Sequence, residues 1–181
     1  MSFSDPRFVR YGVPIKLRHV NTGHVLHSHP INYGGGSRQQ EVTCFMSRDE
    51  NDWWIVKGPH GSSMTIGVYV ANHSIIRLEH IQTRRNLHSH ANIASPATKQ
   101  GEVTAYGNNG NGDGNDNWKL EIVDESAGQA WRGDHTFRLI HCNTNQALHS
   151  HHGHKTATHQ QEVTSFNGRD SNDLWIIEII P

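Results

Sequence analysis

The sequence contains little of several residue types that would indicate a function directly. It has two cysteines, Cys44 and Cys142, in 181 residues, too few for a disulfide framework or a four-cysteine zinc site. Charged residues make up 18 %, and 16 basic against 17 acidic side chains give a net charge of −1. Without a basic excess we expect no nucleic acid as a partner. No apolar run reaches the roughly 18 to 20 residues of a membrane span, so we expect no membrane insertion of this segment.

The first seven residues, Met-Ser-Phe-Ser-Asp-Pro-Arg, lack the apolar core of a secretory signal. Unless a signal has been trimmed from a eukaryotic chain, we therefore expect the cytoplasm or bacterial secretion. The residues leave open whether the sequence is a fragment, what kind of organism it comes from, its oligomeric state, and whether the two cysteines pair.

Histidine is the residue in excess, with 16 copies. Much of this excess comes from a repeat. The tetrapeptide Leu-His-Ser-His begins at Leu26, Leu87 and Leu148, which are 61 residues apart each time. Seven residues before each leucine lies another histidine, so that the series continues with His19, His80 and His141.

Two further motifs follow each Leu-His-Ser-His tetrapeptide in the same order. Glu-Val-Thr begins at Glu41, Glu102 and Glu162. An Asn-Asp pair then precedes a tryptophan and an apolar segment, and these tryptophans are Trp54, Trp118 and Trp175. We therefore divide the chain into three repeat units, at about residues 8–60, 68–124 and 129–180.

The periodicity within each unit is that of short β-strands. Residues 76–80 alternate apolar and polar side chains, as do the equivalent segments of the other units. No window shows the spacing of an amphipathic helix, so each unit predicts four strands, and the chain predicts twelve. Three units of this length favour an all-β fold, a β-trefoil with pseudo-threefold symmetry. The units would share one core, so we expect residues 1–181 to form a single domain, with 57–75 and 123–136 as linkers between units.

The combination of Leu-His-Ser-His, Glu-Val-Thr and Asn-Asp before tryptophan resembles the MIR domain, over roughly residues 8 to 179. This family module occurs in protein O-mannosyltransferases, in inositol trisphosphate and ryanodine receptors, and in stromal-cell-derived-factor-2-like proteins. The resemblance implies a β-trefoil that is not itself catalytic. It also implies either a place beside a membrane-embedded mannosyltransferase or a stand-alone role with chaperone partners in quality control of O-mannosylated proteins.

A metal site is the first alternative that the histidines raise. Two histidines in His-x-His share one face of a strand, about 7 Å apart, and could bind zinc or copper. The same pattern is also explained by one structural solution repeated three times, which we favour, so we expect no metal and no cofactor. The run from His151 to His159 lies outside the repeat and is the better candidate for adventitious metal.

Catalysis and calcium binding have weaker support. Neighbouring residues of a strand point to opposite faces, so Ser28 cannot meet His27 or His29 within its strand. We therefore expect no catalytic residues. The Gly-rich loop 108–116 resembles a calcium loop in composition, but Leu120 stands where the bidentate glutamate would be, which favours a turn.

Carbohydrate binding is the most specific functional hypothesis. β-Trefoils often bind sugars in shallow pockets, one per unit, so we expect the loops 30–38, 91–99 and 152–159 to carry the ligand. The candidate ligand-binding residues are Tyr33, Arg38, Gln39, Glu41, Lys99, Gln100, Glu102, Gln160 and Glu162. These glutamines and glutamates could instead satisfy backbone groups of the hairpins.

The tryptophans of the repeat are expected in the core, whereas Trp53 and Trp131 have no equivalents and either could face solvent. Together with the resemblance to the MIR domain, which implies the process, the sequence predicts a module that recognises a glycan or mannosylated protein in O-mannosylation or its quality control. The alternative is a protein-interaction module that binds a chaperone partner and has no sugar site. The resemblance also implies the lumen of the endoplasmic reticulum if the chain is eukaryotic and trimmed of its signal.

Overall fold

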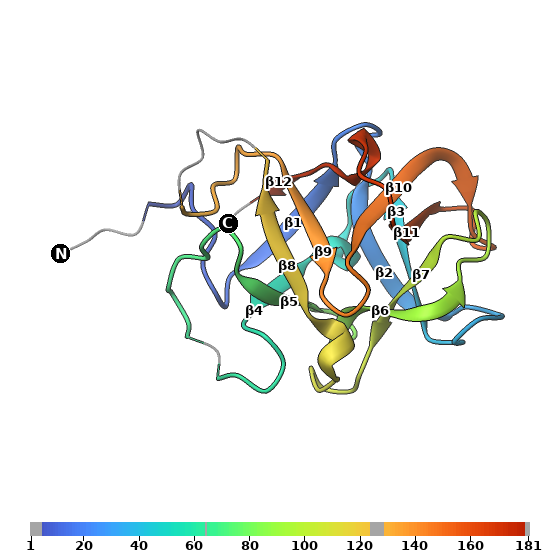
Figure 1. Ribbon diagram of the computed structural model, residues 1–181, viewed down its shortest axis with the longest axis horizontal. Coiled ribbons are helices and arrows are strands. Elements are labelled where there is room, and N and C mark those ends of the chain that lie inside the picture. Colours follow the sequence, from blue (N-terminus) through green and yellow to red (C-terminus); the bar gives the residue numbers. More distant parts are fainter. Residues whose placement is uncertain (1–4, 64, 124–128, 180–181) are drawn as a thin grey trace.

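The computed structural model describes residues 5–63, 65–123 and 129–179 and contains twelve β-strands in a single connected sheet (Figure 1). The first unit contributes β1 (Pro14–His19), β2 (Val25–Asn32), β3 (Gln40–Phe45) and β4 (Trp54–Lys57). The second contributes β5 (Ile75–His80), β6 (Arg85–Ala94), β7 (Gly101–Tyr106) and β8 (Trp118–Ile122). The third contributes β9 (Phe137–His141), β10 (Gln146–Lys155), β11 (Gln161–Phe166) and β12 (Trp175–Ile179).

The outer strands of each unit close a six-stranded barrel. Its antiparallel pairs run β1–β4, β4–β5, β5–β8, β8–β9, β9–β12 and back from β12 to β1. The middle strands form three hairpins, and β3, β7 and β11 pair with one another in a triangle. Figure 1 shows these hairpins at the right, opposite residues 58–63 and 65–74 at the left. This arrangement confirms the predicted β-trefoil. No helix among the described residues is long and apolar enough to cross a membrane.

The core repeats with the sequence. Trp54, Trp118 and Trp175 are wholly buried, as are Leu26, Leu87 and Leu148. Each indole Nε1–H donates to the carbonyl of the leucine of its own unit, at 3.1, 3.0 and 3.0 Å. A buried indole needs this acceptor, since an unpaired buried donor is costly.

Three backbone hydrogen bonds form a ring at one end of the barrel. Val9 N–H donates to Trp131 O (2.8 Å), Trp131 N–H to Val70 O (2.9 Å), and Val70 N–H to Val9 O (3.1 Å). These three residues are 61 apart and all wholly buried. Trp131 is therefore the repeat partner of two valines, and the expectation that it could face solvent is wrong for this residue. The half-buried Trp53 instead lies under Lys16, whose Nζ is 4.9 Å from the ring centroid.

A short 3₁₀ turn precedes the fourth strand of each unit: η1 (Glu50–Asp52), η2 (Gly114–Asp116) and η4 (Ser171–Asp173). Each has a complete capping box, in which an aspartate caps the turn and a second aspartate bonds back to the cap. The Gly-rich loop 108–116 is thus the approach to η2, because Asp113 and Asp116 are its two capping residues.

Candidate functional site

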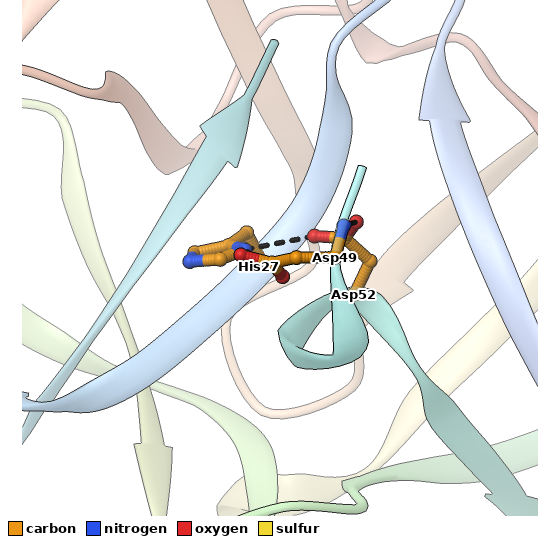
Figure 2. A group of neighbouring side chains, drawn as sticks. All are labelled: His27, Asp49 and Asp52. Carbon is orange, nitrogen blue, oxygen red and sulfur yellow. Dashed lines mark hydrogen bonds and ion pairs between the residues drawn. The ribbon is translucent and has the colours of Figure 1, made fainter. Parts of the chain in front are cut away.

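The His-x-His pairs are bound to the capping aspartates. His27 Nδ1 donates to Asp52 Oδ1 at 2.8 Å, as Figure 2 shows, and His88 and His149 make the same bond to Asp116 and Asp173 at 2.7 and 2.6 Å. The second carboxylate oxygen accepts the backbone N–H of the turn's N-cap residue. Each histidine therefore fastens its hairpin to the 3₁₀ turn of the same unit.

Three groups of one histidine and two aspartates hold their ligand atoms within 4.8 Å of one another: His27, Asp49 and Asp52; His88, Asp113 and Asp116; His149, Asp170 and Asp173. In each group the N-cap aspartate also accepts a backbone N–H, such as Asn51 N to Asp49 Oδ1 at 2.8 Å. Since these oxygens already accept hydrogen bonds within the protein, we interpret the three groups as structural contacts, or ties, that join each hairpin to its 3₁₀ turn.

A second set of ties involves the histidines of the first strand in each unit. His19, His80 and His141 bond the hydroxyl of a threonine three residues on through Nδ1, at 2.8 Å each. Nε2 lies 2.8–2.9 Å from a backbone carbonyl of another unit, so it is the protonated nitrogen. Burial lowers the pKa of all three, to about 4 for His80.

The candidate glutamines join one unit to the next. The side-chain carbonyl of Gln39 accepts from Thr104 Oγ1 at 2.7 Å, and that of Gln100 accepts from Thr164 Oγ1 at 2.6 Å. Gln160 completes the cycle with Thr43. Each glutamine has its carbonyl fixed, which leaves the NH₂ group as the part that can donate to a ligand.

The candidate glutamates form a second cycle in the opposite sense, because each glutamate binds the preceding unit whereas each glutamine binds the following one. Glu41 accepts from His29 Nε2 at 2.8 Å and from Thr158, and Glu102 accepts from Ser37. Glu162 accepts from the backbone N–H groups of Ala97 (2.6 Å) and Thr98 (3.1 Å). All three carboxylates are buried, and each holds a loop of another unit.

The remaining candidates differ in exposure. Tyr33 is buried, 7 % exposed, and its hydroxyl lies 3.1 Å from both Val42 O and Val103 O. Arg38 and Lys99 are exposed, and they share a left-handed backbone with the equivalent His159, with φ of 59°, 64° and 65°. Lys99 Nζ donates to Pro96 O at 2.9 Å. The basic residue thus marks the tip of each hairpin loop.

Two grooves occupy equivalent places between hairpins of adjacent units. The first, which we call the 2/3 groove, has a volume of about 610 Å³ and lies between the second and third units. It is lined by His90, Ala91, Asn92, Ile93, Ala94, Lys99, Gln100, Gly101, Asn143, Thr144, Gln146, Ser165, Phe166 and Asn167. Side-chain amides from both walls dominate it, beside one aromatic ring.

The second groove, the 3/1 groove, has about 510 Å³ and lies between the third and first units. Here His159, Gln160, His24, Cys44, Phe45 and Met46 stand where the 2/3 groove has Lys99, Gln100, Gln146, Ser165, Phe166 and Asn167. Cys44 and Cys142 are both unpaired thiols, and burial raises the pKa of Cys44 to about 12. That thiol is therefore a poor nucleophile at neutral pH.

A third, smaller pocket of about 290 Å³ receives residues of all three units. Its lining includes Tyr33, Glu41, Lys99 and Glu102 together with the glycines 34–36. Four of the candidate residues therefore meet here, whereas Arg38 and Gln39 lie outside the three pockets described above.

These features repeat a pattern found in other proteins. A family model described as the MIR domain matches residues 27–177. The chain belongs to this family. A stromal cell-derived factor 2-like protein of Dictyostelium discoideum is 41 % identical over 94 % of this chain and 82 % of that protein. The crystal structure of the SDF2-like protein from Arabidopsis thaliana covers 94 % of both chains at 39 % identity, with a TM-score of 0.88.

The second kind of MIR relative is an enzyme complex. The structure of an S. cerevisiae protein O-mannosyltransferase complex bound to the sugar donor matches 95 % of this chain at 35 % identity and a TM-score of 0.84. This chain spans only 25 % of that one. The predicted resemblance to the MIR family is therefore confirmed.

Sequence reasoning missed the residues that form the walls of the grooves. Asn143 lies in the turn before β10, and Gln146 and Phe166 lie at the ends of β10 and β11. They meet Lys99 and Gln100 only through the pairing of neighbouring hairpins. A signal was present in the differences between copies, because Gln146 and Asn167 stand where the first unit has His24 and Met46.

Proposed function

We propose that this MIR domain is a binding module, without catalysis of its own, that recognises a glycan or a mannosylated peptide in the 2/3 groove. The observation that carries the proposal is the lining of this groove, where Asn92, Gln100, Asn143, Gln146 and Asn167 supply amides. A side-chain amide both donates and accepts hydrogen bonds, as a sugar hydroxyl does. Phe166 adds an apolar ring surface of the kind that sugar rings stack on.

Pre-organisation supports the same reading. Gln146 Oε1 accepts from Ser165 Oγ at 2.8 Å, and Gln100 Oε1 is held by Thr164 at 2.6 Å. The amide planes are thus fixed before a ligand arrives, which lowers the entropy cost of binding. The MIR relative in a mannosyltransferase complex solved with its sugar donor supports mannose as the first sugar to test, and O-mannosylation or its quality control as the process.

The test is a titration of ¹⁵N-labelled protein with methyl α-mannoside and with an α-mannosylated threonine peptide, followed by amide chemical shifts. We expect saturable shifts at Gln100, Asn143 and Phe166. Gln100→Ala should weaken binding about tenfold, the effect of losing one or two hydrogen bonds to a ligand. Gln160→Ala is the matched control, because it breaks the equivalent glutamine–threonine bond outside this groove.

Arg38→Ala and Tyr33→Ala form a second arm, since the loop of the first unit remains a candidate. If the shifts follow Arg38 instead of Gln100, the ligand lies on the first unit and the 2/3 groove is the wrong site. If no mannoside gives saturable shifts, the glycan proposal fails, and the alternative of a protein-interaction module that binds a chaperone partner takes its place.

A further inference from the structure

Three pairs of barrel strands join neighbouring units: β4–β5, β8–β9 and β12–β1. We call these pairs seams, and they carry different charges at one equivalent position. On β8–β9, Glu121 lies directly opposite Arg138, and their side chains approach to 3.6 Å. On β4–β5, the residues at the same place are Lys57 and Arg77, again directly opposite. Like charges at opposed positions of a sheet are destabilising, so the β4–β5 seam keeps a pair that the repeat plan would not require.

Both cations of this pair are buried, with Lys57 7 % and Arg77 9 % exposed. Lys57 Nζ donates to Gly110 O at 3.0 Å and lies 3.1 Å from Glu79 Oε2. Glu79 also accepts from Arg84, so this one carboxylate is shared between two cations. Burial lowers the pKa of both Lys57 and Arg77, as expected for charges removed from water.

Arg77 is the cation at this position that lacks an ion-pair partner in the described chain, whereas Lys16 and Arg138 have one or more. Within the described chain its guanidinium donates one hydrogen bond, from Nε to Gly58 O at 2.7 Å, and no carboxylate lies within 4.0 Å of it. An arginine carries five N–H donors. The equivalent Lys16 lies 3.6 Å from Asp52, and Arg138 lies within 3.9 Å of Asp173.

These donors face a pocket. A cavity of about 380 Å³ is lined by Lys57, His60, Gly61, Ser62, Arg77, Gly110, Asn111 and Gly112. Gly110 has a left-handed backbone, and a Cβ there would lie 2.7 Å from Glu79 Oε2, so glycine lets this wall lie close to the carboxylate that pairs with Lys57. The cavity wall therefore carries two buried cations, Lys57 and Arg77, and no carboxylate is among its described lining residues.

We propose that this pocket binds a tetrahedral oxyanion, a phosphate or sulfate group, alone or as the monoester of a larger molecule. The guanidinium of Arg77 would hold two of its oxygens through the unused Nη groups, as arginine forks do with phosphate. Lys57 and His60 also line the cavity, and with Arg77 they would offer donors to more than two oxygens of the anion. The site is separate from the 2/3 groove and does not depend on the proposed glycan function.

The experiment titrates ¹⁵N-labelled protein with inorganic phosphate at constant ionic strength set with sodium chloride. We expect saturable amide shifts at His60 and residues 110–112, with no comparable shifts at Lys119 or Arg169 on the exposed surface. Arg77→Gln should weaken phosphate binding about tenfold or more, the loss expected for charge-assisted hydrogen bonds. Arg138→Gln removes the equivalent arginine of another seam and should leave the affinity unchanged.

Titrations with other anions distinguish a free phosphate ion from a phosphate monoester as the ligand. Methyl phosphate should bind as well as phosphate if a monoester is accepted, and tighter binding of phosphate alone limits the site to the free ion. Sulfate should compete, whereas acetate should not. Equal shifts with acetate, shifts spread over all basic residues, or unchanged affinity in Arg77→Gln would overturn the proposal. The shift map of the unmodified protein decides the matter even if Arg77→Gln folds poorly.

Discussion

The interior ties and the surface grooves of this domain follow the threefold repeat to different degrees. Three kinds of hydrogen bond occur once for each unit: from tryptophan to leucine, from histidine to capping aspartate, and from threonine to glutamine. Within each kind the three distances agree within 0.2 Å. The grooves between hairpins occupy equivalent places but are lined by different side chains.

The difference separates residues that hold the fold from residues that can select a ligand. A contact present in all three units is explained by the trefoil itself, since each unit must be fixed to its neighbours. A residue that breaks the repeat without loss of packing, such as Gln146 or Lys57, needs another reason. In a pseudo-symmetric protein the copies thus act as internal controls for one another.

The largest expected effect comes from breaking a repeated tie. Asp116 is wholly buried and accepts from His88, from Asn86 Nδ2 (3.1 Å) and from Asp113 N (3.0 Å). Asp116→Ala leaves these donors buried without an acceptor, so we expect the free energy of unfolding to fall by about 3–5 kcal/mol. Urea denaturation followed by tryptophan fluorescence measures it.

Asp113→Ala is the matched control, because it removes the half-buried N-cap of the same turn. Loss of an N-cap costs about 1 kcal/mol. If the two variants lose equal stability, the buried tie is not the stronger element, and the contrast between core and surface of this turn is wrong.

Acid should weaken the ties made by the first-strand histidines. The pKa of His80 is lowered by burial from 6.5 to about 4, so between these values the unfolded chain binds a proton that the folded chain does not. The free energy of unfolding should therefore fall as the pH is lowered through this window, by about 3 kcal/mol for His80 alone.

Measuring chemical denaturation from pH 7 to pH 4 tests this slope. His80→Gln should flatten part of it, because the residue that must take up the proton is gone. Replacement of the exposed His60 should leave the slope as it is. A slope that is identical in all three proteins would show that carboxylates, rather than buried imidazoles, set the acid sensitivity.

A smaller effect is expected at a residue that occurs once. Tyr33 stands where the other units have Ser95 and Thr156, and its hydroxyl bridges carbonyls of the first and second units. Tyr33→Phe should cost about 1–2 kcal/mol of unfolding free energy, the usual effect of leaving buried acceptors short of a donor. Thermal denaturation checks this, and a stability equal to that of the unmodified protein would return Tyr33 to the role of a ligand-binding residue.

The smallest expected effect is the loss of one of the three equivalent glutamine–threonine hydrogen bonds, which allows the three units to be compared directly. Gln39→Ala, Gln100→Ala and Gln160→Ala each remove one glutamine–threonine bond. We expect nearly equal losses of about 1 kcal/mol in each. A clearly larger loss in one variant would mean that its glutamine does more than join two units.

Much of the fold could be predicted from the sequence because the repeat supplies three readings of each position. Alternating residues such as Ile76 and Leu78 occur in phase in every unit, so strands, core and trefoil follow from one pattern. The repeat of Trp131 was missed because its equivalents, Val9 and Val70, are of another residue type, and because Val70 and Trp131 lie in segments expected to be linkers.

The candidate site was harder to predict from the sequence, for a physical reason. Which loops face one another depends on the pairing of β3, β7 and β11, and sequence spacing does not give the partner of a loop in another unit. The sequence alone could name Lys99 and Gln100, but not that Asn143 and Phe166 form the opposite wall.

The ring formed by Val9, Val70 and Trp131 has a consequence for the order in which the molecule opens. Each of its amides is held by a different unit, so no unit can leave without releasing the others. In native-state hydrogen exchange these three amides should open together and only by global unfolding. Three different exchange free energies would instead divide the chain into separately unfolding parts, against the prediction of a single domain.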